Sequence, residues 1–432
     1  MSGGQRENSI DRSNRRGRQT KRTPNDRERT AISKKRAANG EKEPASSREK
    51  NQNLCPAAKR CGGCTMIHLP YHIQLEKKQR RIEELLKGVC PEIHKIRGMK
   101  EPAHYRNKVH AVFSYQKGKI CSGIYEEGTH HVVPVDSCLL ESGTADAIIR
   151  DIRTLLVQFR MKAYDEDSGY GLFRHALIRV GFHSKEVMVV LVLSSPILPA
   201  KNHFVKALRT LHPEITTIVL NVNDKRTSMV LGERMVPLFG KGYIEDQLCG
   251  YTFRISPSSF YQVNPRQTEL LYQKALELAE LTGKERVLDA YCGTGTIGII
   301  ASKNAGEVIG IELNQDAVRD AVSNAKRNAV SNIRFYQADA AQFMVQMAEC
   351  GDTADIVILD PPRSGSTEEF IKAVQKLSPA RVVYISCNPE TLARDLQIFR
   401  SHGYVPKEAF PYDMFPFTEH VETIVLLQRG TL

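Results

Sequence analysis

Residues 286–298 read Arg-Val-Leu-Asp-Ala-Tyr-Cys-Gly-Thr-Gly-Thr-Ile-Gly, an apolar stretch that runs into a glycine-rich turn. We predict that the stretch is a strand ending near Tyr291 and that the turn opens a helix. Further strands are predicted, mostly separated by helix-length segments, at 308–312, 333–337, 356–360, 382–386 and 423–428. This alternation is typical of βαβ units and predicts an α/β domain over residues 256–432, with a doubly wound, mostly parallel, Rossmann-like sheet.

Residues 54–255 precede this domain and show a different pattern. We expect strands near 108–115, 119–124, 176–182, 187–193 and 217–221, and amphipathic helices that include 141–162. The mixture predicts a central α+β domain. Residues 1–50 lack Phe, Tyr and Trp and carry 15 Lys and Arg against 7 Asp and Glu. We expect residues 1–53 to form a disordered basic tail, since they have too little apolar surface to bury.

Composition narrows the class of protein. The net charge is +12, of which the first 50 residues contribute +8. A basic tail favours a polyanionic partner, most simply a nucleic acid. No apolar run approaches the roughly 18 residues of a membrane helix, so we expect a cytoplasmic protein with no membrane partner. Ten cysteines in 432 residues are too few for a disulfide scaffold and instead direct attention to metal binding or catalysis.

Polar side chains follow the predicted strands, namely Tyr291, Glu312, Asp339, Asp360 and Cys387. Ligands of parallel sheets bind at these carboxyl ends, where glycines allow close approach to a helix N-terminus. A carboxylate at Glu312 can accept hydrogen bonds from ribose hydroxyls, which fits either NAD or S-adenosylmethionine. The turn reads Asp-Ala-Tyr-Cys-Gly-Thr-Gly-Thr from Asp289, and Asp360 begins an Asp-Pro-Pro sequence, and both features favour the methyl donor.

Cys387 lies 27 residues after Asp360, in Ser-Cys-Asn-Pro, and 35 residues before Glu422. A thiol, a carboxylate and a methyl donor suit methylation of carbon 5 of uracil, which is a weak nucleophile unaided. Thiolate addition to carbon 6 makes carbon 5 electron-rich, and a base then removes the carbon 5 proton. We predict Cys387 as the nucleophile and Glu422 as the base, with Asp360 and Gln262 holding the ring, the donor or both.

These motifs resemble the RNA uracil-C5 methyltransferase family, which modifies transfer and ribosomal RNA with S-adenosylmethionine. The resemblance covers most of residues 54–432. It rests on Phe260–Asn264, Asp289–Gly295, Asp360–Arg363, Ser386–Pro389 and Asp413–Glu422. It implies donor contacts at Gln262, Tyr291, Glu312 and Asp360, and also at Thr296 and Asp339, with Cys387 as nucleophile and Glu422 as base. The chain departs from many relatives because residues 1–53 are too short and polar for an N-terminal β-barrel RNA-binding domain.

Cys55, Cys61 and Cys64 follow a C-x5-C-x2-C spacing. The spacing alone leaves a 4Fe–4S cluster and zinc open. Family members with an iron–sulfur cluster add a distant fourth cysteine, which Cys138 matches. The resemblance therefore implies a 4Fe–4S cluster held by these four thiols.

Three alternatives remain open. In the first, the substrate is transfer RNA rather than ribosomal RNA, which we favour. In the second, the methyl acceptor is a base amine rather than carbon 5 of uracil. In the third, the protein is a non-catalytic iron–sulfur RNA-binding protein. Arg106, Lys108 and Arg174 are the candidate RNA contacts of the central domain. We expect a monomer.

Overall fold

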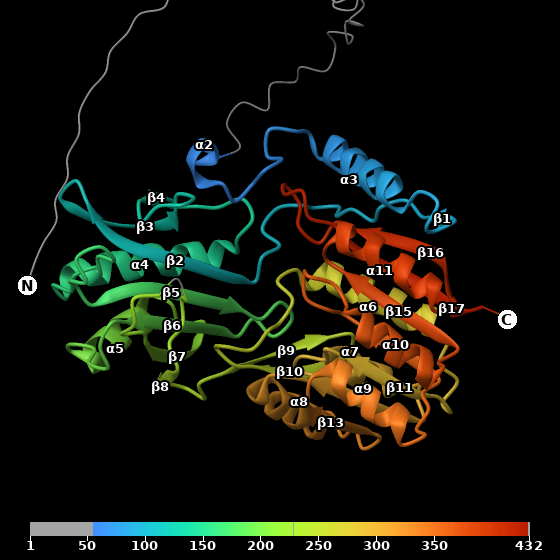
Figure 1. The fold of residues 1–432 in the computed structure, drawn as a ribbon. Helices are drawn as coiled ribbons and strands as arrows, with labels where there is room; N and C mark the ends of the chain where they lie inside the picture. Colours follow the sequence, from blue (N-terminus) through green and yellow to red (C-terminus); the bar gives the residue numbers. More distant parts are fainter. Residues whose placement is uncertain (1–54, 228, 431–432) are drawn as a thin grey trace, which may run out of the picture. The chain divides into compact units, whose positions relative to one another are not determined.

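The computed structural model describes residues 55–227 and 229–430, so the predicted disordered tail lies outside the described residues. Within them the chain forms an eight-stranded sheet, a seven-stranded sheet and a small two-stranded sheet (Figure 1). The last strand before the α/β region ends at Ile255 and its first helix begins at Pro265. The domain boundary predicted between residues 255 and 256 stays a prediction.

The eight-stranded sheet has the order β1-β16-β17-β15-β14-β11-β12-β13. Its strands are β1 (Glu92–Ile93), β11 (Arg286–Ala290), β12 (Glu307–Glu312), β13 (Ile333–Gln337), β14 (Ile356–Leu359), β15 (Arg381–Ser386), β16 (Tyr404–Tyr412) and β17 (Glu422–Arg429). Strands β11 to β15 are parallel, and β17 runs antiparallel to β15. The predicted doubly wound, mostly parallel sheet is confirmed. The chain reverses its direction of winding between β11 and β14, where ligands of such sheets bind.

Helices cover both faces of this sheet, which explains why its central strands are continuous apolar runs. They are α6 (Pro265–Ala279), α7 (Thr296–Ala301), α8 (Gln315–Arg327), α9 (Ala340–Glu349), α10 (Glu368–Leu377) and α11 (Pro389–Ser401). One face packs on α9, α10, α11 and the end of α3 (Tyr71–Leu86), and the other packs on α6 and α7. Helix α11 begins at Pro389 because Asn388 caps it, accepting a hydrogen bond from the Glu390 N–H.

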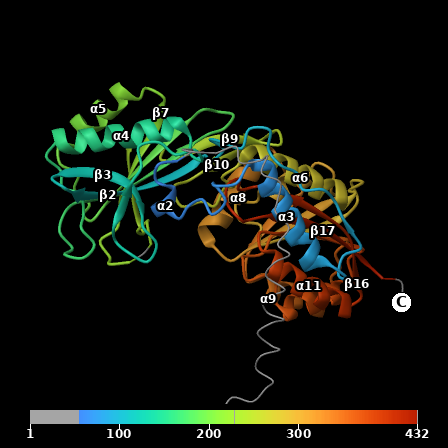
Figure 2. The same ribbon diagram turned by 90° about the horizontal axis from the view of Figure 1, so that it is seen from above.

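The seven-stranded sheet has the order β4-β3-β2-β5-β6-β7-β8 and confirms the predicted α+β central region. Its strands are β2 (Lys108–Gln116), β3 (Lys119–Tyr125), β4 (Val132–Pro134), β5 (Phe173–Val180), β6 (Val187–Leu193), β7 (Ile215–Val222) and β8 (Arg234–Phe239). Helices α4 (Gly143–Gln158) and α5 (Lys201–Leu211) lie on one face (Figure 2). Residues of the other face, such as Met188, share a core with β9 (Ile244–Leu248), β10 (Tyr251–Ile255) and Val287 of β11.

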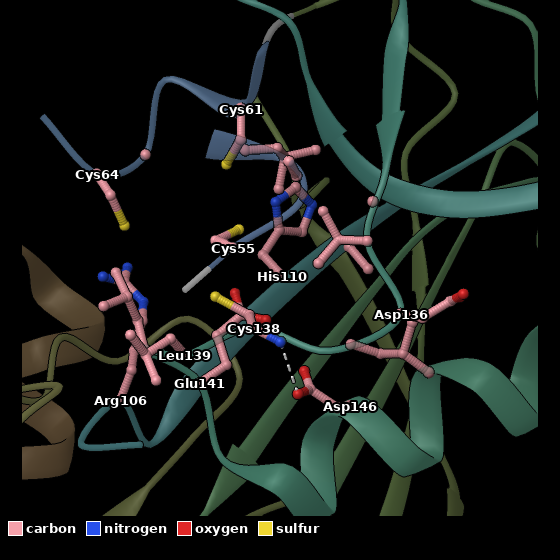
Figure 3. A pocket seen from close by; sticks show the side chains of 18 of the residues that line it. Cys55, Cys61, Cys64, Arg106, His110, Asp136, Cys138, Leu139, Glu141 and Asp146 are labelled. Carbon is pink, nitrogen blue, oxygen red and sulfur yellow. Dashed lines mark hydrogen bonds between the residues drawn. The ribbon is translucent and has the colours of Figure 1, made fainter. Parts of the chain in front are cut away.

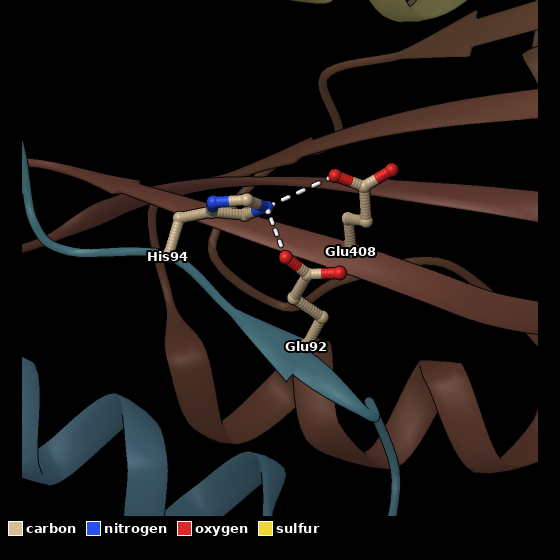
Figure 4. Close-up of side chains that lie close together, drawn as sticks. All are labelled: Glu92, His94 and Glu408. Carbon is tan, nitrogen blue, oxygen red and sulfur yellow. Dashed lines mark hydrogen bonds and ion pairs between the residues drawn. The ribbon is translucent and has the colours of Figure 1, made fainter.

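Strand β16 was not predicted from the sequence. Pro406 and Pro411 argue against a central strand, since proline has no N–H to donate. The strand forms because its only long partner is β17, and a bulge follows Pro406. On its other side β16 pairs with only two residues of β1. His94 holds β1 there, with its Nε2 2.9 Å from Glu408 and 3.3 Å from Glu92 (Figure 4).

Helix α3 buries a polar stripe rather than a purely apolar one. Tyr71, Gln74 and Lys78 lie on one face and contact residues 413–421, the loop that joins β16 to β17. Lys78 Nζ donates to Asp413 Oδ1 at 2.6 Å and to the Phe415 carbonyl at 3.1 Å, and both charged side chains are fully buried. The Tyr71 hydroxyl donates to Asp413 Oδ2 at 2.8 Å. The helix therefore satisfies several of the polar groups of this loop.

The buried ion pair predicts a large stability effect. Lys78→Met should lower the free energy of unfolding by about 3–5 kcal/mol, because it leaves the Asp413 carboxylate buried without a cation. Urea denaturation followed by circular dichroism measures the loss. Lys225→Met, which breaks an exposed ion pair with Glu233, is the matched control and should leave unfolding unchanged. Equal losses in the two variants would contradict the role of burial.

Candidate active site and cysteine pocket

The turn after β11 forms the floor of a narrow pocket at the switch point of the sheet. Tyr291 has φ of +63°, a left-handed conformation that is unusual for a residue with a side chain and is often found at ligand sites. Gly295 has φ of +76°, and a Cβ there would lie 2.7 Å from the Phe335 ring. Both geometry and space therefore require glycine at this position. The pocket lining includes predicted donor contacts from three segments of the chain, namely Gln262, Tyr291, Thr296 and Asp360.

Two of the remaining acidic residues also lie near this turn. Glu312, at the end of β12, accepts hydrogen bonds from the N–H groups of Gly293 at 3.0 Å and Asn314 at 2.8 Å, which fix its carboxylate beside the pocket. Asp289 is buried, and its Oδ2 accepts the Gly298 N–H at 2.8 Å. Burial raises the pKa of Asp289 to about 7. Asp289 therefore shapes the turn, a role that the sequence analysis did not assign to it.

Asp339 is the remaining predicted donor contact. It is exposed, follows β13, and caps α9 by accepting the Gln342 N–H at 3.1 Å. Neither Asp339 nor Glu312 is among the described residues that line the pocket. The Ala338 N–H donates to the Glu312 carbonyl at 3.1 Å, so Asp339 still follows Glu312 along the same edge of the sheet.

Cys387 and Glu422 are brought together by strand pairing. Ser386, the last residue of β15, pairs with Thr423 of the antiparallel strand β17. The residue after β15 and the first residue of β17 therefore meet at the carboxyl edge of the sheet. Asp360 follows β14, the neighbour of β15 on its other side. The carboxyl edge of the sheet thus brings together three predicted site residues that are separated by up to 62 positions in the sequence.

The electrostatics of these three groups are coupled. The pKa of Glu422 is raised to about 8, by burial first and then by Asp360, while Arg363 opposes the shift. Burial also raises the pKa of Asp360 to about 7. The thiol pKa of Cys387 is raised to about 11, by burial first and then by the two carboxylates, while Arg363 lowers it. Cys387 also directly precedes the N-terminus of α11, whose dipole favours a thiolate.

Cys387 has its own opening to the surface. The pocket beside it is lined by Arg363, Asn388 and His420, together with Arg81 of α3 and Glu390. The Asn388 side chain donates to the Arg363 carbonyl at 3.0 Å, which ties the segment after Asp360 to the segment that holds the thiol. Arg363 and Arg81 were not singled out as site residues from the sequence, although Arg363 belongs to the quoted Asp-Pro-Pro-Arg motif.

Four cysteines line a second pocket, in the central region of the chain (Figure 3). Cys55, Cys61 and Cys64 come from the segment around α2 (Ala58–Cys61), and Cys138 follows β4. The side chains of all four lie around the same space, and all are free thiols. The Cys138 N–H donates to Asp146 Oδ2 at 3.0 Å, which anchors the loop that carries this thiol to α4. The fold therefore gathers the four cysteines that the sequence analysis grouped.

Of the three candidate RNA contacts, Arg174 is not available at the surface. Its guanidinium is fully buried, pairs with both oxygens of Glu166, and donates to the carbonyls of Asn223 and Lys225. Lys108 differs, because burial and then the neighbouring Arg179 and Arg106 lower its pKa to about 8. Within the described ranges, neither Lys108 nor Arg106 forms a salt bridge. Arg174 is therefore a structural residue.

The fold and the pocket at the switch point define a methyltransferase. The crystal structure of the Pyrococcus abyssi tRNA (uracil-54, C5)-methyltransferase in complex with S-adenosyl-L-homocysteine superposes with a TM-score of 0.72 at 29% identity. The superposition covers 85% of this chain and 86% of that chain.

The chain belongs to the tRNA (uracil-5-)-methyltransferase family, whose model matches residues 70–430. An RNA methyltransferase of Caldanaerobacter subterraneus subsp. tengcongensis is 41% identical over 388 residues, covering 88% of this chain and 86% of the relative. One from Halalkalibacterium halodurans is 39% identical over 378 residues, covering 87% and 82%. The predicted family is thereby confirmed, and the non-catalytic alternative finds no support. Among the helices of the described part of the chain, none is long and apolar enough to cross a membrane.

Proposed function

We propose that this protein methylates carbon 5 of a specific uridine in RNA, with S-adenosylmethionine as the methyl donor. The observation that carries the proposal is the register of β15 and β17, which sets Cys387 beside Glu422 at the ligand-binding edge of a methyltransferase sheet. A base-amine target needs neither group. The solved P. abyssi relative, with S-adenosyl-L-homocysteine bound, supports the same donor and the same uracil position.

In the proposed reaction Cys387 adds as a thiolate to carbon 6 of the uracil, which becomes an enolate. Carbon 5 then takes the methyl group that S-adenosylmethionine supplies. Glu422 removes the carbon 5 proton, the double bond re-forms, and the Cys387 sulfur leaves carbon 6. Arg363 favours the anionic form of both side chains, since it lowers the pKa of each. The uridine has to leave its stack for Cys387 to reach it.

We assign donor binding to the pocket at the switch point. Gln262, Tyr291, Thr296 and Asp360 line it, and the Glu312 carboxylate faces the glycine turn. Glu312 would accept ribose hydroxyls, as acidic residues after the second strand do in related sheets. Asp339 is the weakest member of the proposed set, because it is exposed and already caps α9.

We favour ribosomal RNA as the substrate, on the strength of the cysteine pocket, and keep transfer RNA as the second candidate because the P. abyssi relative acts on tRNA uracil 54. Arg106, which lines the cysteine pocket, and Lys108, the first residue of β2, are proposed as contacts to the RNA backbone, with the basic tail adding charge. The deciding experiment incubates the enzyme and labelled S-adenosylmethionine with unmodified ribosomal and transfer RNA and maps C5-methyluridine. If the enzyme binds S-adenosylmethionine but transfers label to neither RNA, the proposal is rejected.

We further propose that Cys55, Cys61, Cys64 and Cys138 hold a 4Fe–4S cluster, whose role here is structural. Among the described residues, no three of these sulfurs lie within 4.8 Å of one another. Tetrahedral zinc, with Zn–S bonds of about 2.3 Å, would bring its sulfurs to roughly 3.8 Å. The wider arrangement around one pocket suits a cluster of several atoms better than a single ion, and four thiolates are its usual ligands.

The cluster proposal predicts about four iron and four sulfide ions per chain in protein purified without oxygen. Cys64→Ala should remove most of that iron together with its visible absorbance, because one of four ligands is lost. Cys121→Ala, which changes a buried cysteine on β3 away from the pocket, is the matched control and should keep the full content. One zinc ion per chain and no iron would overturn the assignment.

A further inference from the structure

The loop of residues 413–421 is anchored by the cysteine-bearing segment as well as by α3. The Met66 N–H donates to the Phe417 carbonyl at 2.9 Å, and the Glu419 N–H donates to Thr65 Oγ1 at 3.1 Å. These partners directly follow Cys64 in the chain. The Phe417 N–H donates to Gln74 Oε1 of α3 at 2.8 Å. Both main-chain groups of Phe417 are therefore held by the N-terminal part of the described chain.

The Phe417 side chain belongs to an apolar cluster beside the cysteine pocket. It is buried with Ile67, Tyr105 and Leu140, and the partly buried side chains of three cysteines pack against this cluster, namely Cys55, Cys64 and Cys138. Its φ is +67°, in the left-handed region. Such a backbone is unfavourable for a bulky residue, so the surrounding contacts have to maintain it. A phenylalanine held in this way specifies one path for the loop.

Only four residues separate Phe417 from Glu422, and the loop closes where Tyr412 pairs with Glu422. The path of the loop therefore determines where the Glu422 carboxylate stands. Cys387 is held independently, because Ser386 Oγ bonds to the Asn388 carbonyl at 3.0 Å and Asn388 to Arg363. Loosening Phe417 should disturb the carboxylate and leave the thiol in place.

We propose that Phe417 is a positioning residue through which the cysteine pocket fixes the base Glu422 for proton removal. The inference rests on the proposed roles of Cys387 and Glu422, and it adds that the cysteine pocket serves the second half of the reaction. Loss of the Phe417 anchor slows the step in which Glu422 takes the carbon 5 proton and the Cys387–carbon 6 bond breaks. Formation of that bond is not slowed.

The test compares Phe417→Ala, Phe417→Gly and Phe417→Leu with wild type. Phe204→Ala, which empties a similar volume in the core of the central sheet, is the matched control for general destabilisation. Adduct formation is measured on 5-fluorouridine RNA, which has no removable carbon 5 proton. Turnover and KM are measured on uridine RNA, and the covalent complex that accumulates during turnover is quantified on denaturing gels.

We expect Phe417→Ala to lower kcat about 10- to 100-fold with little change in KM for RNA, and to accumulate the methylated adduct, since small displacements of a reacting group have effects of this size. Phe417→Gly should be as slow, although glycine adopts a φ of +67° freely, because the side chain is the anchor. Phe417→Leu should recover part of the rate. Phe204→Ala should accumulate no covalent complex during turnover of uridine RNA.

Hydrogen exchange supplies a readout that does not depend on turnover. The amides of Phe417 and Glu419 should exchange faster in Phe417→Ala, and also in wild-type protein stripped of metal by a chelator, than in the protein as purified. Three results would each overturn the inference. They are unchanged amide exchange after the metal is stripped, a wild-type turnover rate in Phe417→Gly, and accumulation of the covalent complex on uridine RNA by Phe204→Ala. Failure of wild-type protein to form an adduct on 5-fluorouridine RNA would instead reject the proposed function.

Discussion

Cys387→Ala should abolish C5-methyluridine formation to below detection and should form no gel-stable complex with 5-fluorouridine RNA. Without sulfur addition to carbon 6, carbon 5 lacks the electron density to take a methyl group, and no nearby side chain can substitute. Donor binding should persist, because the pocket at the switch point contains no part of Cys387. Isothermal titration with S-adenosylmethionine and mass mapping of RNA measure the two effects separately.

The control for this variant is Cys350→Ala, which removes an exposed thiol at the end of α9 and should keep full activity. Cys387→Ser is a second check, since its hydroxyl is a far weaker nucleophile than a thiolate. If either Cys387 variant methylated uridine at the wild-type rate, covalent catalysis would be excluded. The family assignment would survive that result, because it rests on the whole chain.

Glu422→Gln should lower turnover by a factor of about 10² to 10⁴, the usual contribution of a positioned general base. The amide has nearly the same shape as the carboxylate but cannot accept the carbon 5 proton. Cys387 should still add to uracil and the methyl group should still transfer. The variant should therefore accumulate a methylated covalent complex with ordinary uridine RNA, which wild-type enzyme resolves. Denaturing gels and mass spectrometry of the cross-linked peptide measure this complex.

The pH dependence provides an independent check on Glu422. Burial raises its pKa to about 8, so in the free enzyme the carboxyl is mostly protonated below that pH and becomes a base above it. The single-turnover rate of proton removal by the wild-type enzyme should rise with pH up to about 8. The residual rate of Glu422→Gln should lack this rise. Glu349→Gln, an exposed change on α9, should retain the wild-type profile. A flat wild-type profile would contradict Glu422 as the base.

Much of the catalytic domain follows from local sequence signals. Strands β11 to β15 were predicted to within about one residue. Four of them are apolar runs between turn residues that are buried on both faces, and the exception is the edge strand β13, which is largely exposed. The polar residues after them were expected at one edge for the same reason, since parallel strands place their carboxyl ends together. Strand β16 escaped this reasoning, because its prolines are tolerated only at the position near the sheet edge that tertiary pairing assigns to it.

Polar burial was the other feature that sequence reasoning missed. Lys78 and Arg174 look like solvated surface cations in the sequence, yet each is fully buried against a carboxylate. Lys78 lies 335 residues from Asp413, so no local pattern relates them. A long charged side chain gives the same sequence signal whether it faces water or a buried partner. Only the arrangement of the whole chain distinguishes the two environments.

By itself the sequence determined the α/β fold and the family and supplied the candidate chemical groups, because apolar periodicity and short motifs are local properties. The tertiary structure decided how those groups act together. Antiparallel pairing of β17 with β15 places Glu422 beside Cys387. Packing of Phe417 against the cysteine pocket directs the loop that leads to Glu422. Both arrangements depend on contacts between residues that are distant along the chain, which only the folded core brings within reach.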